Sequence, residues 1–297
     1  MRVVYPPPFS YWRAESVAEA SAALRCEPGA IPLAGATDVI SMRNSGALAP
    51  SLLVDLKRID ELQGIQRADG KLRLGSCVTI AELAGLEDAQ AAALIDGARV
   101  FGAVQTRNRA TLGGNICRSS PAGDTLPALL ALGAEVLIAS ESDARRLPLD
   151  EFFLGPGENA LTEGEVLVGV ELPGAPGASA YERVTYRAWM DLAVIGVAVR
   201  IALDDDRCTD AAIALGGVAP TPLLVPAAAT ALISSALEHL DVEAATEAAL
   251  EAANPIDDVR GSRDYRLRAL RALVPRMIAR ARARHADRDA VRGTSDG

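Results

Sequence analysis

The chain has 297 residues, of which 49% are hydrophobic and 23% charged, so it is long enough for more than one globular domain. Its formal net charge of −9 repels nucleic acid phosphates and anionic lipid surfaces, which excludes both as favoured partners. No apolar run reaches membrane-spanning length and the N-terminus has no export signal, so the sequence predicts a cytoplasmic protein without a membrane span.

The first 56 residues read as small α/β units and form the first predicted subdomain. Residues 16–19, Ser-Val-Ala-Glu, have the pattern of a capping box, in which the serine oxygen and the glutamate carboxylate bind free N–H groups at a helix start. An Ala-rich run continues this helix, and Pro28-Gly29 ends it. Residues 31–34 and 52–56 are predicted strands.

Residues 57–175 form the second predicted subdomain. Residues 71–74, 135–139 and 166–172 are predicted strands, and a second capping-box pattern at residues 79–82 predicts another helix start. The stretch 101–132 is irregular and ends in an apolar helix. The run 174–177, Gly-Ala-Pro-Gly, is a predicted linker.

Residues 176–286 form the third predicted domain. Three strand candidates, at residues 179–184, 192–203 and 211–217, precede Ala-rich helical stretches at 227–253 and 263–284. Consecutive strands followed by helices indicate a separate α+β domain with a three-stranded antiparallel sheet. The polar residues 287–297 are predicted to be a disordered tail.

Catalytic side chains are scarce. The lysines Lys57 and Lys71 follow no glycine-rich loop, and the two histidines, His239 and His285, lie in helical stretches typical of a solvated surface. The four cysteines form no CxxC pair, so neither an iron–sulfur cluster nor a structural metal is expected within this chain. The sequence therefore predicts no catalytic side chain and indicates that any chemistry belongs to a bound cofactor.

The first loop that points to a ligand is Pro-Leu-Ala-Gly-Ala-Thr-Asp, residues 32–38. A strand runs into a small-residue turn and then into a helix start, an arrangement that directs several backbone N–H groups at one anion. Gly35 permits close approach of the main chain, and the Thr37 hydroxyl adds a donor. The alternative for an isolated match is an ordinary strand-to-helix turn capped by Thr37 or Asp38.

The second loop runs from Gln105 to Asp124. Gly113 and Gly114 are expected to offer bare backbone to a phosphate, with Thr111 and Asn115 as neutral donors on either side. Asp124 is placed to accept hydrogen bonds from sugar hydroxyls, as acidic residues do in other dinucleotide sites. Its alternative role is the N-cap of the following helix. Neutral donors would explain how an acidic, lysine-poor chain holds an anionic cofactor.

The stretch QTRNRATLGGNICRSSPAGDTLPALLAL, residues 105–132, resembles the signature of the FAD-binding subunits of molybdenum hydroxylases, a family that includes the medium subunits of aerobic carbon monoxide dehydrogenases and the FAD domain of xanthine dehydrogenases. The resemblance covers nearly the whole chain. The motifs PLAGATD, LVDLKRIDELQGI, PLDEFF, GEVLVGVELP, GGVAPTP and DVRGSRDYRLRAL occur in family order.

The resemblance implies a vanillyl-alcohol-oxidase-like FAD-binding fold, in which two α/β subdomains hold FAD and a C-terminal α+β domain closes over it. It also implies which residues contact FAD. The two loops would hold the diphosphate, Asp124 would lie near the ADP portion, and Leu167, Arg183 and Leu192 would lie near the flavin. The full implied set is Pro32, Leu33, Ala34, Gly35, Ala36, Thr37, Asp38, Thr111, Gly113, Gly114, Asn115, Asp124, Leu167, Arg183 and Leu192.

Three residues depart from the family pattern. Relatives usually carry Gly or Asn where this chain has Ala36, and alanine tolerates positive φ only at a cost of roughly 1 kcal/mol. The sequence therefore predicts a slightly different loop shape or, alternatively, Ala36 at negative φ. Arg183 stands where relatives often carry a lysine near the flavin, and it keeps the positive charge. Arg118 replaces a small residue and is interpreted as a solvated surface arginine or, alternatively, a partner contact.

The resemblance implies an electron relay. A large partner subunit with a molybdenum cofactor would oxidise the substrate, and a small partner subunit with two 2Fe–2S clusters would carry electrons to FAD on this chain and so to an external acceptor. A dimer of such heterotrimers is the expected assembly. Two alternatives stay open: a stand-alone FAD-dependent oxidoreductase of the same fold, and a non-catalytic interaction protein that has lost FAD.

Overall fold

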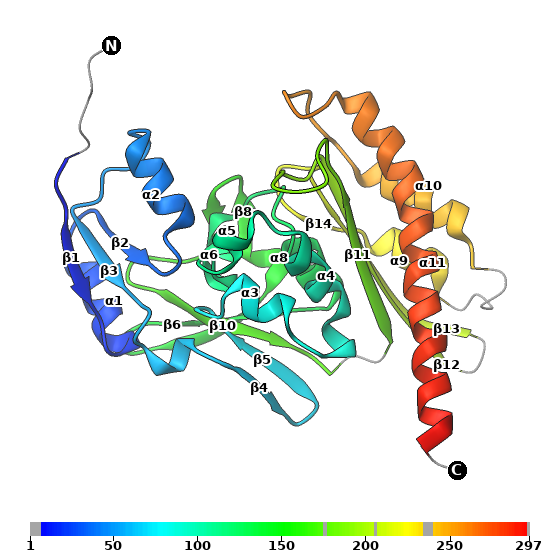
Figure 1. Ribbon diagram of the computed structural model, residues 1–297, viewed down its shortest axis with the longest axis horizontal. Coiled ribbons are helices and arrows are strands. Elements are labelled where there is room, and N and C mark those ends of the chain that lie inside the picture. The colour runs from blue at the N-terminus through cyan, green and yellow to red at the C-terminus, as the bar shows by residue number, and fades with distance from the viewer. Residues whose placement is uncertain (1–6, 175–176, 205–206, 234–239, 296–297) are drawn as a thin grey trace.

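The computed structural model describes residues 7–174, 177–204, 207–233 and 240–295, so His239 lies outside the described residues. Three units follow one another along the longest axis of the molecule, in chain order from one end to the other (Figure 1). Among the described helices, none has the length and apolar character needed to cross a bilayer.

The first unit is a three-stranded parallel sheet in the order β1-β3-β2 with two helices. The Ser16 hydroxyl caps the first helix as predicted, accepting from the Glu19 N–H at 3.2 Å, but the Glu19 carboxylate accepts from the N–H of Glu15 and leaves the capping box half formed. The elements are β1 (Ser10–Arg13), α1 (Val17–Cys26), β2 (Ala30–Leu33), α2 (Thr37–Asn44) and β3 (Leu52–Asp55).

The second unit is a five-stranded antiparallel sheet in the order β4-β5-β10-β6-β7. The predicted capping box at Thr79 and Glu82 is confirmed in full. The strands are β4 (Ile65–Ala68), β5 (Lys71–Gly75), β6 (Glu135–Ala139), β7 (Ala144–Pro148) and β10 (Val166–Leu172), and a small hairpin pairs β8 (Phe153–Gly155) with β9 (Glu158–Asn159). The helices are η1 (Asp60–Leu62), α3 (Ile80–Ala84), η2 (Ala89–Ala91), α4 (Ala92–Val100), α5 (Val104–Arg107), α6 (Leu112–Arg118), α7 (Leu126–Ala131) and α8 (Leu149–Phe152).

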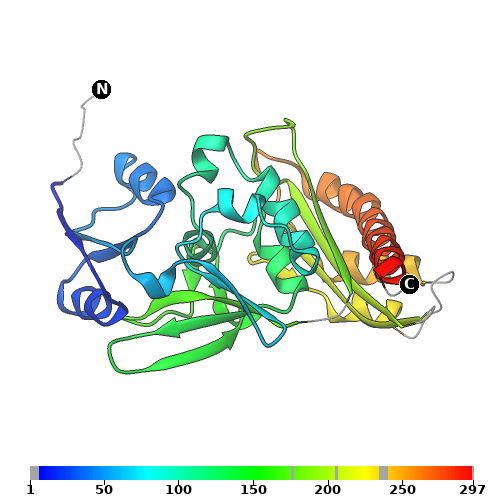
Figure 2. The same cartoon turned by 60° about the horizontal axis from the view of Figure 1, so that its bottom comes forward.

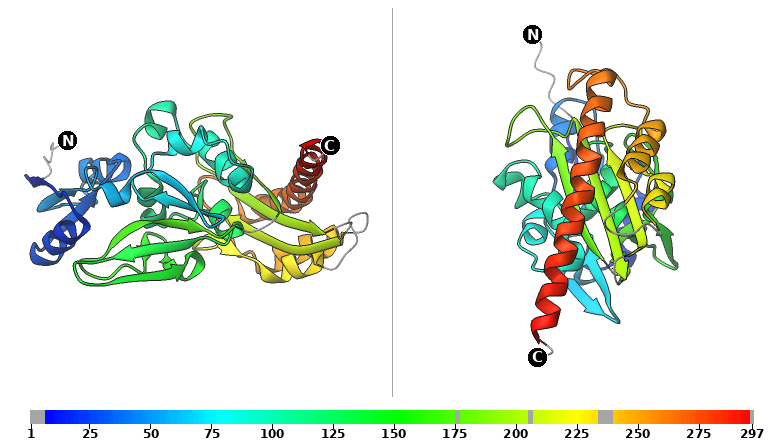
Figure 3. Two further views of the ribbon diagram at one scale, coloured as in Figure 1. Left: turned by 90° about the horizontal axis from the view of Figure 1, so that it is seen from below. Right: turned by 90° about the vertical axis from the view of Figure 1, so that its right-hand side faces the viewer.

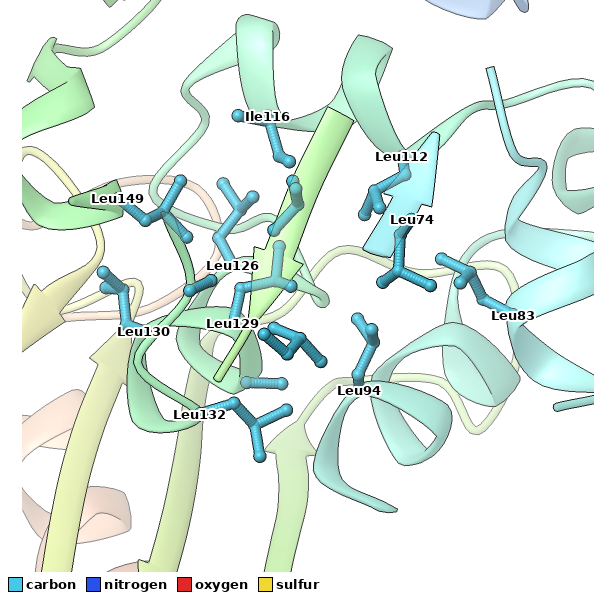
Figure 4. Close-up of a cluster of buried hydrophobic side chains, with 14 of the residues drawn as sticks. Leu74, Leu83, Leu94, Leu112, Ile116, Leu126, Leu129, Leu130, Leu132 and Leu149 are labelled. Atoms are coloured by element: carbon cyan, nitrogen blue, oxygen red, sulfur yellow. The ribbon is translucent and has the colours of Figure 1, made fainter. Parts of the chain in front are cut away.

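The main core lies between this sheet and the helices that cover one of its faces (Figures 2 and 4). Leu74 of β5 and Leu94 of α4 belong to it, together with Leu112, Ile116, Leu126 and Leu129 from α6 and α7. Burial of such side chains contributes about 1.5–3 kcal/mol each. This core therefore fixes α6, whose N-terminal loop carries half of the predicted site.

The third unit is an antiparallel sheet in the order β11-β12-β13-β14. The predicted antiparallel sheet is confirmed, and the structure adds the two-residue strand β14, which is too short for a sequence pattern to reveal. The elements are β11 (Ala178–Val184), β12 (Ile195–Asp204), β13 (Arg207–Gly216), β14 (Leu223–Leu224), α9 (Pro226–Leu232), α10 (Val242–Ala252) and α11 (Arg263–Ser295). Helix α11 runs along one face of the sheet and continues to Ser295, where the sequence had predicted a disordered tail from residue 287 (Figure 3).

The second and third units are joined by a buried ion-pair cluster. Asp96 of α4 is 8% exposed, and it accepts hydrogen bonds from Arg284 of α11 at 2.7 and 2.9 Å and from the Tyr181 N–H of β11 at 3.1 Å. Arg284 also donates to the Ser179 carbonyl at 2.7 Å. Because every charge in the cluster has hydrogen-bonded partners, the burial of Asp96 is compensated and the two units are held in register.

Candidate functional site

The two predicted loops meet in the structure. The first connects β2 to α2 and the second connects α5 to α6. At Gly35 they touch: a Cβ atom there would lie 2.1 Å from the Arg109 carbonyl oxygen and 2.9 Å from the Ala110 Cα. Close packing is the reason for glycine at this position. Its backbone conformation is not the reason, because its φ lies outside the left-handed region.

A cavity of about 370 Å³ opens between the two loops, which is within the usual range for a small-molecule site. Of the fifteen residues implied by the family resemblance, four do not line it: Leu33, Asp124, Arg183 and Leu192. The structure brings the other eleven together around it: Pro32, Ala34, Gly35, Ala36, Thr37, Asp38, Thr111, Gly113, Gly114, Asn115 and Leu167. These eleven residues come from segments far apart in the chain and line one cavity in the fold.

The N-terminus of α2 supplies free donors at this cavity. The Ala36 side chain cannot cap the helix, and the first backbone bond into it is from the Ile40 N–H to the Ala36 carbonyl. Within the part of the chain that the structure describes, the N–H groups of Thr37, Asp38 and Val39 donate to no protein acceptor. An uncapped first turn that faces a cavity, with the positive end of the helix dipole, is suited to an anion.

Ala36 adopts φ 67° and ψ 0°, a left-handed conformation. The predicted alternative of a negative φ at Ala36 is therefore wrong: the residue lies in the region that glycine or asparagine would tolerate, and alanine is strained in it.

We therefore expect Ala36→Gly to stabilise the protein by about 0.5–1 kcal/mol, the relief of strain less the extra flexibility of glycine in the unfolded chain. Thermal unfolding of the two proteins measures this. Asp69→Gly is the matched control: Asp69 has φ 52°, but aspartate tolerates this region, so a smaller gain is expected. An Ala36→Gly protein that melts below the wild type would contradict the strain argument.

The second loop differs from its prediction. The four N–H groups at the start of α6 are all engaged: Leu112 with the Val78 carbonyl, Gly113 with the Ser76 carbonyl, Gly114 with the Thr111 hydroxyl and Asn115 with the Thr111 carbonyl, at 2.8–3.1 Å. The expectation that Gly113 and Gly114 offer free N–H groups is therefore wrong. Gly113 lacks a Cβ because one would lie 2.6 Å from the Ser76 Cβ, and a Cβ at Gly114 would lie 3.0 Å from the Thr111 Oγ1.

Side chains take the place of these N–H groups in the second loop. The Thr111 hydroxyl accepts from Gly114, and its own proton has no acceptor among the described residues. Asn115 accepts from the Thr125 hydroxyl at 2.6 Å, which leaves its Nδ2 group without an acceptor among the described residues. Thr125 is fully buried and was missed by the sequence, because the distance between Asn115 and Thr125 is set by the fold of the intervening loop.

Asp124 and Arg183 lie together outside the cavity. Arg183 Nη1 donates to Asp124 Oδ2 at 2.6 Å, and the Tyr181 hydroxyl donates to Oδ1 at 3.0 Å. The two charged side chains are 4% and 6% exposed. Burial raises the pKa of Asp124 to about 6, while Arg183 and Tyr181 oppose the rise. The alternative N-cap role is not realised either, since α7 starts at Leu126 after Thr125.

Leu192 lies on the loop between β11 and β12 and is 58% exposed. Tyr186, Trp189 and Met190 on the same loop are exposed to a similar degree. In this conformation the loop contributes no residue to the cavity.

Two ionisable groups at the cavity, Cys117 and Glu165, are unsuited to proton transfer near neutral pH. Burial raises the pKa of the Cys117 thiol to about 12, so it stays protonated. Hydrogen bonds from Arg145 lower the pKa of Glu165 to about 2, so it stays ionised and paired. Neither of these two groups is therefore poised to exchange a proton at neutral pH.

Comparison with known proteins matches two family models. Residues 7–175 match the FAD-binding domain in molybdopterin dehydrogenase, and residues 179–281 match the C-terminal domain of CO dehydrogenase flavoprotein. Together they span nearly the whole chain.

Curated relatives match over nearly their whole length. The chain is 33% identical to the putative xanthine dehydrogenase FAD-binding subunit of Escherichia coli (strain K12), over 92% of this chain and 95% of that one. It is 32% identical to the carbon monoxide dehydrogenase medium chain of Hydrogenophaga pseudoflava, over 94% and 99%. A solved structure of carbon monoxide dehydrogenase from the same organism, which lacks the Mo-pyranopterin moiety of the molybdenum cofactor, superposes with a TM-score of 0.89 at 32% identity, covering 95% of this chain and all of that one.

Proposed function

The chain belongs to the family of FAD-binding subunits of molybdopterin dehydrogenases, and from that premise we propose that it binds FAD in the cavity between its two loops and relays electrons from a partner's redox centres to an external acceptor. The single observation that supports this placement of FAD is the uncapped first turn of α2, whose first three residues line the cavity and whose N–H groups donate to no acceptor among the described residues. A diphosphate is the part of FAD that such donors suit.

In the proposed complex, the N–H groups of Thr37, Asp38 and Val39 hold the diphosphate from one side. Thr111 and Asn115 donate from the other side through their side chains. Leu167 and the neighbouring wall of β10 exclude water from the cofactor. FAD, when bound, supplies the exchange between single electrons and electron pairs.

The partners are part of the proposal. A large subunit with the molybdenum cofactor, a small subunit with two 2Fe–2S clusters and a dimer of these heterotrimers follow from the family and are not visible in one chain. Contacts of Asp124, Arg183 and Leu192 with FAD stay predictions, as does a cytoplasmic location. The exposed loop that carries Leu192 would have to close toward the cavity for that contact.

The test is purification of the chain together with whatever partners it retains. We expect a flavin absorption spectrum, about one FAD per chain, and molybdenum and iron in the same particle. A chain that retains FAD but never associates with molybdenum- or iron-containing subunits would favour the stand-alone oxidoreductase. A chain that takes up no FAD, alone or in its complex, would overturn the proposal.

Thr125→Val tests the role of Asn115 in this site. Valine has the same shape, but it cannot donate to Asn115 Oδ1, so the amide loses its orientation. We expect FAD to bind about 3–10-fold more weakly and the fold to lose about 1 kcal/mol, the usual effect of removing one buried hydrogen bond. FAD titration and thermal unfolding measure the two effects.

Thr230→Val is the control, because Thr230 is exposed on α9 and donates only to the Pro226 carbonyl. It should leave FAD affinity unchanged. Equal FAD affinity in the wild type and Thr125→Val would remove Asn115 from the binding site.

A further inference from the structure

We infer that Arg118 binds the diphosphate of the cofactor and that Asp38 competes with the cofactor for Arg118. The inference rests on the proposed function and names a cation that the two loops themselves do not provide. In the structure Arg118 Nε lies 3.9 Å from Asp38 Oδ1, the outer limit of an ion pair.

The first observation concerns where Arg118 and Asp38 lie. Arg118 is the last residue of α6, and Asp38 lies in the first turn of α2, so the pair connects the helices that follow the two loops. Both side chains line the cavity, and they are 42% and 60% exposed. A long, exposed ion pair contributes little to stability, so Arg118 can leave Asp38 at little cost.

The second observation concerns the charges of the residues that line the cavity. Among the described residues that line the cavity, Arg118 is the only cation, whereas Asp38 and Glu165 are anions. Glu165 is already paired with Arg145 at 2.7 and 2.8 Å, which leaves Asp38 as the carboxylate that repels a bound diphosphate. An arginine that moves from Asp38 to a phosphate exchanges a weak exposed contact for charge-assisted hydrogen bonds with a better geometric match.

The third observation concerns the position of the Arg118 guanidinium group. A Cβ atom at Gly157 would lie 3.0 Å from Arg118 Nη1, so the side chain passes directly over the turn between β8 and β9. That turn is tied to α6, because Asn159 Nδ2 donates to the Cys117 carbonyl at 2.9 Å. The hairpin therefore limits where Arg118 can move and keeps it at the cavity.

The experiment measures FAD affinity of the full chain, in its native complex if it is isolated in one, at low and high ionic strength. We expect Arg118→Gln to raise the dissociation constant about tenfold at low ionic strength and to flatten its salt dependence. Asp38→Asn should lower the dissociation constant, because it removes both the competitor and a like charge. Thermal unfolding controls for folding, and Arg118→Lys should recover part of the affinity.

ADP serves as a second probe, since it carries the diphosphate without the flavin, and riboflavin carries neither phosphate. Arg118→Gln should weaken competition by ADP and leave riboflavin unaffected. An Arg118→Gln protein with wild-type affinity and salt dependence would overturn this inference while leaving FAD binding intact. A wild type that binds no FAD would instead overturn the proposed function.

Discussion

Gly35→Ala should abolish tight FAD binding and destabilise the protein. The added methyl group would lie 2.1 Å from the Arg109 carbonyl oxygen and 2.9 Å from the Ala110 Cα, and both contacts are backbone that cannot rotate away. The two loops must separate, which moves the first turn of α2 away from Thr111 and Asn115. We expect a loss of about 1–3 kcal/mol of stability, the usual range for overpacking, and at least about tenfold weaker FAD binding.

Gly85→Ala is the matched control, because a Cβ there would meet nothing closer than 3.7 Å and its backbone is in the right-handed helical region. That variant should keep its flavin content and its melting temperature. The measurements are flavin absorbance per chain and thermal unfolding for both variants. Full flavin retention by Gly35→Ala would show that the contact between the loops does not shape the site.

The sequence predicted that the two loops matter, and the structure brings them together at one cavity, but the sequence did not predict the hydrogen bonds that they make. The glycines and small residues of the two loops mark positions where another group approaches the backbone closely, and a sequence pattern can locate such positions. It cannot say what comes close. Gly35 approaches Arg109 and Gly113 approaches Ser76, and both partners are brought in by tertiary packing. Hence the second loop was predicted to donate through N–H groups that the fold uses for its own hydrogen bonds.

Elements with a strong local sequence pattern were predicted, whereas elements that form only through tertiary contacts were not. The capping box at Thr79 needs only four consecutive residues and is confirmed. Strand β1 is exposed along its whole length, so no alternation marks it, and it exists because it pairs with β3. Thr125 likewise has a role only because the chain turns back toward Asn115.

The pairing of Asp124 with Arg183 also depends on tertiary packing, which the sequence does not reveal. The family resemblance assigns them to opposite ends of the cofactor, near the ADP portion and near the flavin. The fold instead places the end of β11 beside the loop before α7, where the two side chains pair at 2.6 Å. Neither lines the cavity, so their first role in this structure is to hold the third unit against the second.

Asp124→Ala should therefore destabilise the fold by about 3–5 kcal/mol, since it leaves the Arg183 guanidinium buried without a counterion. Arg183 Nη2 already has no hydrogen-bond partner among the described residues, so none of them offers a second acceptor in place of the carboxylate. The Tyr181 hydroxyl loses its acceptor as well. Chemical denaturation of the wild type and the variant measures the difference.

Replacing Asp124, Arg183 and Tyr181 together distinguishes the effect of the lost charges from the effect of the lost packing. The triple variant Asp124→Leu, Arg183→Met and Tyr181→Phe removes every buried polar group that the single variant would leave unpaired. It should recover most of the lost stability, because apolar side chains of similar volume replace buried ion pairs at little cost. A triple variant as unstable as Asp124→Ala would show that the cluster acts through specific shape rather than charge.

The pH dependence of stability tests the balance within the cluster. Burial raises the pKa of Asp124 from its ordinary 3.8 to about 6, so between these values the folded protein holds a proton that the unfolded chain has released. The part of the stability that comes from this raised pKa is thus fully present below about pH 4 and is lost as the pH rises through about 6. Subtracting the profile of the triple variant from that of the wild type isolates it. A difference that rises with pH below about 4 and stays flat from about 4 to 6 would mean that attraction by Arg183 outweighs burial, and that the pKa of Asp124 is lowered in the folded protein.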